Sequence, residues 1–526
     1  MSNPLRIRRQ LHPSDSRLTK YDGTIVAVPS TAIAQLDHVD VRRRDTSRKL
    51  DPSRKAALGQ FMTPASTARF MAGMFADVAG RTVRLLDAGA GVGSLTSAFL
   101  DRCLTSAPAA VAVGAWEIDP VMHEGLASTL RGYEEAAAAA GMKFDARVYA
   151  EDFIESATRA LFAGPRRDFT HAILNPPYKK ISTTSGHRLL LRGAGIETVN
   201  LYTAFVAVAL DMLAPDGELV AILPRSFCNG PYYLAFREYL FRRAALRAVH
   251  LFARRNRAFK EEGVLQENVI IHLVRSAVQG NVRVTTSSDD TFTDFAEASY
   301  PFDTIVKPDD AQRFIHIPSG EAQSAVEIST VANQSLSALG LAVSTGPVVD
   351  FRMREHLLKD PGPGSVPLLY PAHFTSARLS WPLRDFKKSN AIQLNDDTAR
   401  WLYPAGRYVV VRRFSSKEER RRMVASIVEQ DDFDSAHVGF ENHLNVFHIG
   451  RHGLPEAVAY GLAAWLNSTA VDEHFRRFNG HTQVNATDLR QMPYPPIAVL
   501  EKLGAWYIKN TAAEQLELDT KVEAIL

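Results

Sequence analysis

The 526-residue sequence predicts an α/β protein whose main domain is a sheet flanked by helices. Three observations predict this fold. Short apolar runs at residues 83–87, 112–117 and 171–174 alternate with stretches that have helical spacing. A glycine cluster follows the first run and leads into a helix, and a pair of prolines ends the last one. Strands that alternate with helices in this way form largely parallel sheets covered on both faces.

Composition places the chain among ordinary globular proteins. Hydrophobic residues make up 46% and charged residues 23%, which excludes a disordered chain or a fibre. Lys and Arg number 61 against 58 Asp and Glu, so any nucleic-acid-binding surface must be local. Two cysteines, no signal-like N-terminus and no long apolar run predict a cytoplasmic protein without a membrane partner. The sixteen histidines have no metal-ligand spacing, so we expect no metal.

Changes in composition and charge along the sequence predict four regions. Residues 1–58 form a basic arm, since the first 60 residues hold twelve Lys or Arg against six Asp; the arm is either solvated or follows phosphates. Residues 59–275 are the main domain. Residues 276–330, rich in Ser, Thr, Asp and Pro, are a connector with a few short strands. Residues 331–526 are a second, α+β domain.

The chemistry-bearing residues of the main domain come at the ends of successive strands. Asp87 precedes the glycine turn of residues 89–93, and this acid suits a cationic ligand better than a polyphosphate. Glu117 ends the next strand, where a carboxylate can accept two hydrogen bonds from a ribose diol. Asp152 and Phe153 follow the third strand, where they can bind an adenine amine and cover an adenine face. Each acid alone is no more than a surface acid, but the ordered set predicts a nucleoside cofactor.

This order of motifs resembles the S-adenosylmethionine site of class I methyltransferases, with their Rossmann-like mixed sheet. Residues 59–64 resemble the segment that precedes this fold in enzymes that methylate DNA amines. Without that resemblance, Thr63 reads as the N-cap and Pro64 as the first residue of a helix. The resemblance implies these cofactor-binding residues: Thr63, Pro64, Asp87, Gly89, Ala90, Gly91, Glu117, Asp152, Phe153 and Asn175.

The sequence Asn175-Pro176-Pro177-Tyr178 ends a buried strand in a stiff corner, because two prolines cannot continue a sheet ladder. An aromatic amine is a poor nucleophile because its lone pair is conjugated with the ring. Acceptors at the Asn175 side-chain oxygen and the Pro176 carbonyl would bind the amine hydrogens and free that lone pair. Tyr178 can stack on the base. We expect these four residues to be catalytic.

Such a corner occurs in enzymes that methylate adenine N6, cytosine N4, guanine N2 in RNA, or glutamine in proteins, so it does not fix the acceptor by itself. The motif order here resembles the gamma-type adenine-N6 DNA methyltransferases of restriction–modification systems. That resemblance implies a site-specific enzyme that acts on double-stranded DNA, with a separate cognate restriction endonuclease as a further partner. The alternative is an RNA or protein (glutamine) N-methyltransferase.

A base inside a duplex must be flipped out to reach the corner. Phe259 matches the position of a second base-stacking aromatic in the family, and Phe252 is its rival; core packing is the alternative for either. Residues 242–260 hold seven Lys or Arg and no acid. We expect DNA-backbone contacts from Arg254, Arg255, Arg257 and Lys260; a solvated helix face is the alternative.

The second domain has one informative stretch, residues 466–489. Its segments resemble target-recognition domains of DNA methyltransferases, where they are mostly scaffold, and residues 343–352 resemble the start of such a domain. Residues 59–75 and 480–489 also resemble XhoI-type methyltransferases, whose target is a palindromic hexamer.

Overall fold

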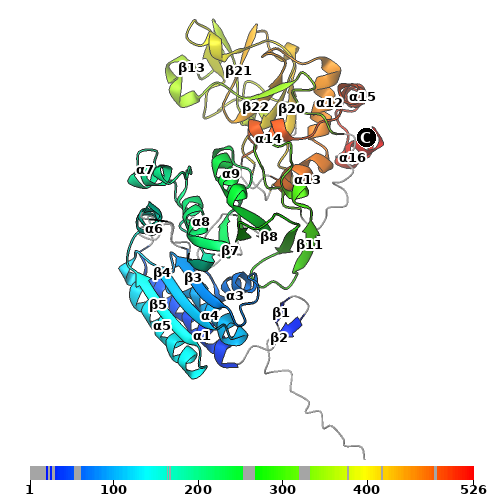
Figure 1. The fold of residues 1–526 in the computed structure, drawn as a ribbon. Helices are drawn as coiled ribbons and strands as arrows, with labels where there is room; N and C mark the ends of the chain where they lie inside the picture. Colours follow the sequence, from blue (N-terminus) through cyan, green and yellow to red (C-terminus); the bar gives the residue numbers. More distant parts are fainter. Residues whose placement is uncertain are drawn as a thin grey trace, which may run out of the picture. The chain divides into compact units, whose positions relative to one another are not determined.

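The chain divides into two compact units, Met1–Ile315 and His316–Leu526 (Figure 1). The computed structural model describes residues 19–21, 24–26, 30–51, 61–162, 164, 168–252, 267–318, 332–375, 378–415, 419–478 and 483–525. Within these residues, no helix combines the length and the apolar character that a bilayer span requires.

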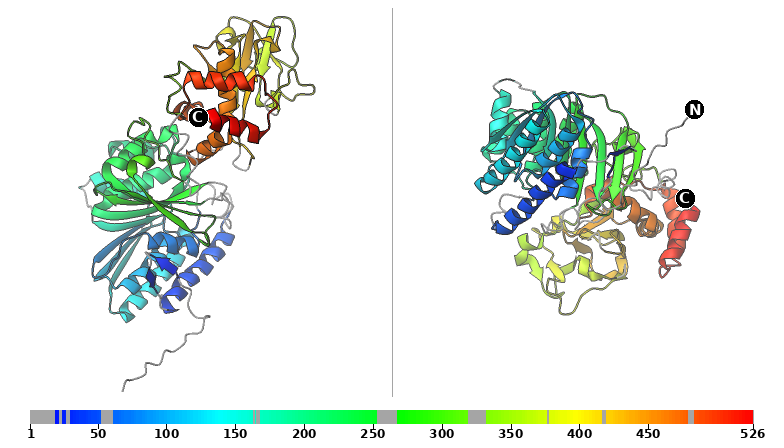
Figure 2. Two further views of the ribbon diagram at one scale, coloured as in Figure 1. Left: turned by 90° about the vertical axis from the view of Figure 1, so that its right-hand side faces the viewer. Right: turned by 90° about the horizontal axis from the view of Figure 1, so that it is seen from below.

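A nine-stranded mixed sheet organises the first unit, in the order β11-β10-β8-β9-β7-β6-β3-β4-β5. Five neighbouring strands, from β7 to β5, run parallel. Strand β9 lies antiparallel between β7 and β8. Figure 2 shows the sheet continuing from its blue and cyan strands into its green ones. The strands are β3 (Thr82–Ala88), β4 (Ala110–Trp116), β5 (Lys143–Tyr149), β6 (Phe169–Leu174), β7 (Leu213–Pro224), β8 (Ala244–Phe252), β9 (Asn268–Arg275), β10 (Val282–Ser287) and β11 (Ala296–Tyr300).

Helices cover the sheet in two groups. Helices α1, α3, α4 and α5 pack together on one face, where they share a core with β3, β4 and β7 (Figure 1). Helices α6, α7, α8 and α9 pack against one another as the second group. Their bounds are α1 (Ser30–Lys49), α3 (Ala65–Gly73), α4 (Ser94–Ser106), α5 (Pro120–Ala139), α6 (Phe153–Phe162), α7 (Gly186–Gly193), α8 (Leu201–Met212) and α9 (Leu234–Arg243).

Two segments of the first unit are more structured than the sequence predicts. Part of the expected basic arm is helix α1, in which Arg43 is buried against Asp40 and Arg42 donates to the Gly125 carbonyl of α5. These arginines therefore hold the helix in place instead of following phosphates. Within the expected connector, β10 and β11 extend the sheet beyond β8. Strand β7 is irregular near its start, where Asp216 has a positive φ of 59°.

The described part of the second unit combines two small sheets, a two-stranded pair and a helical layer. One sheet has the order β12-β22-β19-β20 and the other β13-β17-β14-β21-β18, and the pair consists of β15 (Phe374–Thr375) and β16 (Arg378–Leu379). The strands of the two larger sheets are β12 (Ala342–Thr345), β13 (Leu357–Leu358), β14 (Ser365–Leu369), β17 (Ala391–Gln393), β18 (Tyr403–Pro404), β19 (Tyr408–Arg412), β20 (Ala425–Val428), β21 (His437–Phe440) and β22 (Leu444–His448). The helices are α12 (Glu456–Leu466), α13 (Thr469–Phe478), α14 (Ala486–Gln491), α15 (Ile497–Tyr507) and α16 (Gln515–Ile525).

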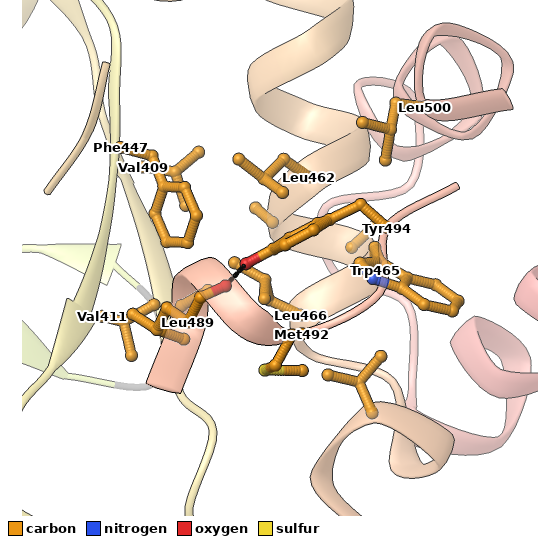
Figure 3. Packing of buried hydrophobic residues seen from close by; sticks show 14 of the residues in the cluster. Val409, Val411, Phe447, Leu462, Trp465, Leu466, Leu489, Met492, Tyr494 and Leu500 are labelled. Carbon is orange, nitrogen blue, oxygen red and sulfur yellow. Dashed lines mark hydrogen bonds between the residues drawn. The ribbon is translucent and has the colours of Figure 1, made fainter. Parts of the chain in front are cut away.

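The main core of this unit lies between the first of these sheets and α12, α14 and α15 (Figure 3). Trp465 and Leu462 of α12 pack in one cluster with Val409 and Phe447 of the sheet. Tyr494 is buried there and donates its hydroxyl hydrogen to the Leu489 carbonyl at 2.6 Å. Of the stretch that resembles target-recognition domains, Asn467 bonds through its side chain to both backbone groups of Ala425. Such contacts fit a scaffold role.

Candidate active site at the carboxyl ends of the parallel strands

The glycine turn between β3 and α4 needs glycine for two reasons. Gly89, Gly91 and Gly93 have φ values of 77°, 57° and 88°, a region that side chains with a Cβ rarely adopt. A Cβ on Gly93 would also lie 3.1 Å from the side chains of Leu126 and Thr129. The backbone of this turn is therefore free to line a cavity without side chains in the way.

Asp87 lies beneath this turn and is fully buried. Its Oδ2 accepts a hydrogen bond from the Thr96 hydroxyl at 2.6 Å. Burial raises the pKa of Asp87 to about 7, although the bond from Thr96 opposes the shift. The residue supports the turn from the side of the core.

Glu117 connects the turn to the end of β4. Its Oε2 accepts from the Gly91 N–H at 2.8 Å, and its Oε1 accepts from the Asp119 N–H at 2.7 Å. Burial raises the pKa of Glu117 in spite of these bonds. Each carboxylate oxygen has a second lone pair, so Glu117 can still accept from a ligand.

Asp152 and Phe153 come together with a residue that the sequence did not indicate. The Asp152 Oδ1 accepts from the Glu155 N–H at the start of α6, and its Oδ2 lies 3.2 Å from the Nε2 of His187 in α7. Burial opposes ionisation of Asp152, but the bond from His187, the backbone N–H bonds at the start of α6 and the attraction to His187 together lower the pKa of this carboxyl. Phe153 packs on Phe205 with ring centroids 5.0 Å apart.

The Asn-Pro-Pro-Tyr corner follows β6 directly. The Asn175 Nδ2 donates to the Phe61 carbonyl at 2.6 Å and to the Thr63 hydroxyl oxygen at 2.9 Å. Thr63 thus accepts from Asn175; helix α3 begins at Ala65, and Pro64 takes the N-cap position expected of Thr63. The Tyr178 ring lies 5.6 Å from that of Phe61, and its hydroxyl donates to the Ile222 carbonyl at 3.4 Å.

These groups surround one cavity of about 240 Å³. Nine of the predicted residues line it: Thr63, Gly89, Ala90, Gly91, Glu117, Asp152, Phe153, Asn175 and Pro177. Pro64, Asp87, Pro176 and Tyr178 adjoin these residues in the chain without belonging to the lining. The cavity wall also contains residues that the sequence did not single out, including Phe61, Glu151, Lys179 and His187.

Lys179 follows the corner directly, so the motif itself was a signal for it. His187 lies in a short helix with no motif around it, and nothing in the sequence pairs it with Asp152.

The structure does not describe the residues predicted for the second base-stacking position and for the basic cluster. Phe259, Arg254, Arg255, Arg257 and Lys260 lie outside the described residues. Phe252, the rival of Phe259, is only 1% exposed and belongs to the core of the first unit. For Phe252, core packing is therefore the correct reading.

Comparisons with known proteins indicate the family of the chain. Residues 132–259 match the family model described as Eco57I restriction-modification methylase. The Type II methyltransferase M.BsuBI of Bacillus subtilis is 47% identical over 90% of this chain and 94% of its own length. The Type II methyltransferase M.PstI of Providencia stuartii is 41% identical over 89% of this chain and 92% of its own length.

Among solved structures, the Type IIL restriction-modification enzyme MmeI, solved in complex with DNA, has a similar fold. The match covers 94% of this chain and 73% of that chain, with a TM-score of 0.54 and 11% sequence identity.

The mixed sheet, with β9 antiparallel and a glycine turn after β3, is that of the class I methyltransferases. The identity with M.BsuBI and M.PstI over most of the chain is more specific. The chain belongs to the Type II methyltransferases of restriction–modification systems.

Proposed function

We propose that this protein is the site-specific DNA methyltransferase of a restriction–modification system, and that it transfers a methyl group from S-adenosylmethionine to adenine N6 in double-stranded DNA. The single observation that carries the proposal is that Asn175 lines the cavity in which the cofactor is expected to bind. Asn175 lines the same cavity as Gly91 and Glu117, so an acceptor held at the corner would meet a ligand held by the turn.

The lining of the cavity fits the cofactor. Glu117, Glu151 and Asp152 bring three carboxyl groups to it, against the ammonium of Lys179 and the imidazole of His187. An excess of acids favours a ligand with positive charge, and S-adenosylmethionine carries a sulfonium and an ammonium. Glu117 has lone pairs for a ribose diol, and Phe153 offers an aromatic wall. When bound, the cofactor supplies a methyl group on positively charged sulfur.

The residues of the corner would act on the acceptor. The Asn175 Oδ1 and the Pro176 carbonyl accept the two hydrogens of the amine and turn its lone pair out of the ring system. Tyr178 holds the base by stacking. Alignment then contributes most of the rate, because the amine needs no strong base before it attacks.

A base in a duplex reaches this corner only by leaving the stack, which costs a few kcal/mol of unstacking. The proposal therefore includes base flipping. Phe259 as the second stacking aromatic, and Arg254, Arg255, Arg257 and Lys260 as phosphate contacts, remain part of it as predictions from the sequence. The second unit is proposed as the target-recognition domain, and a separate endonuclease as the cognate partner.

The alternative acceptors are RNA and protein glutamine. The relatives over most of this chain are Type II methyltransferases, which favours DNA. A tritium-transfer assay with duplex DNA, RNA and protein lysate separates these acceptors. Label in duplex DNA alone is the expected result.

The test of the corner is the variant Asn175→Ala. It should abolish methyl transfer to DNA and leave the dissociation constant for S-adenosylhomocysteine within about threefold of the wild-type value, because Asn175 contributes one group to a large cavity. Full activity in this variant would rule out the corner as the catalytic site.

A further inference from the structure

The side chain of Asn175 is held from one side by the segment that precedes α3. Its amide nitrogen donates one hydrogen to the Phe61 carbonyl at 2.6 Å and the other to the Thr63 hydroxyl oxygen at 2.9 Å. Both amide hydrogens are therefore in use. Thr63 is 4% exposed, so water does not readily replace it as the acceptor.

These two bonds determine which way the amide faces. A backbone carbonyl can only accept a hydrogen bond, so the nitrogen of the amide must face Phe61 and the oxygen must face away. If the amide rotated by half a turn, its oxygen would oppose the Phe61 carbonyl oxygen. The segment thus turns Oδ1 away from Phe61 and Thr63, and Oδ1 is the atom that the proposed chemistry uses.

We infer that Thr63 is a positioning residue for methyl transfer: its hydroxyl oxygen, together with the Phe61 carbonyl, fixes the Asn175 amide so that Oδ1 faces the target amine. This inference rests on the proposed function of the corner. It assigns Thr63 a role toward the acceptor, separate from the cofactor contact that the sequence predicts for it.

Removal of the Thr63 hydroxyl tests the inference. Thr63→Val has nearly the same shape, but it leaves one amide hydrogen of Asn175 without an acceptor, so the amide can rotate or shift. We expect the single-turnover rate of methyl transfer to fall about tenfold to a hundredfold, the usual cost of a lost oriented hydrogen bond. Thr63→Ser keeps the hydroxyl and should stay within about threefold of the wild type.

The same chain offers a matched control. Thr67 lies four positions further on, is fully buried, and has a hydroxyl with no hydrogen-bond partner in the described part of the chain. Thr67→Val makes the same chemical change in α3 without touching Asn175. It should leave the single-turnover rate within about twofold of the wild type.

The rival explanation is that Thr63 acts only through the cofactor, since it also lines the cavity. The dissociation constant for S-adenosylhomocysteine, measured by calorimetry on each variant, separates the two. Positioning predicts a lower rate at saturating cofactor with a dissociation constant within about threefold of the wild type. A rate that recovers fully at saturating cofactor would overturn the inference.

A replacement variant and an analysis of the product nucleoside complete the test of the Thr63 role. If Thr63→Val is too unstable to bind S-adenosylhomocysteine, Thr63→Ala serves in its place, and an unchanged rate in either folded variant overturns the inference. All rates are measured as total labelled methyl in cognate DNA, followed by analysis of the product nucleoside. A wild-type product other than N6-methyladenine overturns the proposed acceptor, while the Thr63 comparison still decides the positioning role.

Discussion

Two buried carboxyl groups set the behaviour of the first unit at the scale of single residues. Burial raises the pKa of Asp87 to about 7, and it does the same for Asp101, which accepts a hydrogen bond from the Tyr133 hydroxyl. The unfolded chain would ionise both near pH 4. Below that pH both states bind the protons, and between pH 4 and 7 only the folded state keeps them.

The stabilising effect of these protons is therefore complete below about pH 4 and is lost as the pH rises through about 7. We expect Asp87→Asn, which removes the charge, to raise the unfolding temperature of the protein relative to the wild type at pH 8 and to raise it clearly less at pH 5. Thermal unfolding at the two pH values measures this. Asp77→Asn, on the surface, is the control, and an equal effect of Asp87→Asn at both pH values would contradict the assigned shift.

Tyr178 tests the proposed stacking at the same scale. Its ring adjoins Phe61 and Tyr202, and its hydroxyl makes a long bond to the Ile222 carbonyl. We expect Tyr178→Phe to keep most of the activity and Tyr178→Ala to lose about 1–3 kcal/mol of binding for the flipped base. The ratio kcat/KM for cognate DNA is the measurement. Equal losses in both variants would assign the role to the hydroxyl.

The sequence predicted those site residues whose position is set by the end of a strand or by a rigid motif. Gly91, Glu117 and Asn175 were predicted because each follows an apolar run, and parallel strands bring such ends to one edge. His187 was not predicted, because its meeting with Asp152 depends on the path of the chain between β6 and α8. The hydrogen bond from Asn175 to Thr63 was not predicted either, because 112 positions separate the two residues and only the fold brings them together.

At the scale of elements, α12 and α15 cross at close range in the core of the second unit. A Cβ on Gly461 would lie 1.8 Å from the Leu500 carbonyl oxygen, and one on Gly504 would lie 1.8 Å from that of Ala457. Only glycine at both positions lets the two backbones meet.

Gly461→Ala should therefore destabilise the protein by about 1–3 kcal/mol or more, since the helices must move apart. Gly362→Ala, where a Cβ meets nothing within 4 Å, is the matched control and should be close to neutral. Chemical denaturation followed by tryptophan fluorescence reports the difference, because Trp465 and Trp506 pack in this core. Equal stability of the two variants would contradict the close packing.

Elements buried on both faces were the easiest to predict. Strands β3, β4 and β6 are buried over their last four residues, and most of these residues are apolar; Asp87 and His171 are the polar exceptions. Strand β5 gave a weak signal because it is an edge strand whose residues alternate between exposed and half-buried. Strands β10 and β11 were assigned to a connector because β11 is exposed and polar, and α1 was hidden by its arginines.

At the scale of the whole molecule, the candidate site belongs to one unit. All residues that line the cavity lie between Phe61 and Phe205, within the first unit. That unit also has its own sheet and its own core. The division of labour proposed for the two units follows from this arrangement.

Residues 1–315 alone should bind S-adenosylhomocysteine within about threefold of the full chain, yet they should not methylate the cognate site, because target recognition is assigned to the second unit. Calorimetry and a methylation assay on cognate DNA test the two halves of this expectation. Site-specific methylation by residues 1–315 would remove the recognition role from residues 316–526.

The most direct test of the central claim is the identity of the methylated nucleoside. Duplex DNA is treated with the protein and isotope-labelled S-adenosylmethionine, digested to nucleosides and analysed by mass spectrometry. The corner mechanism with adenine as acceptor predicts label in N6-methyladenine with the wild type and none with Asn175→Ala. Label in N4-methylcytosine, or label that persists in Asn175→Ala, would contradict it.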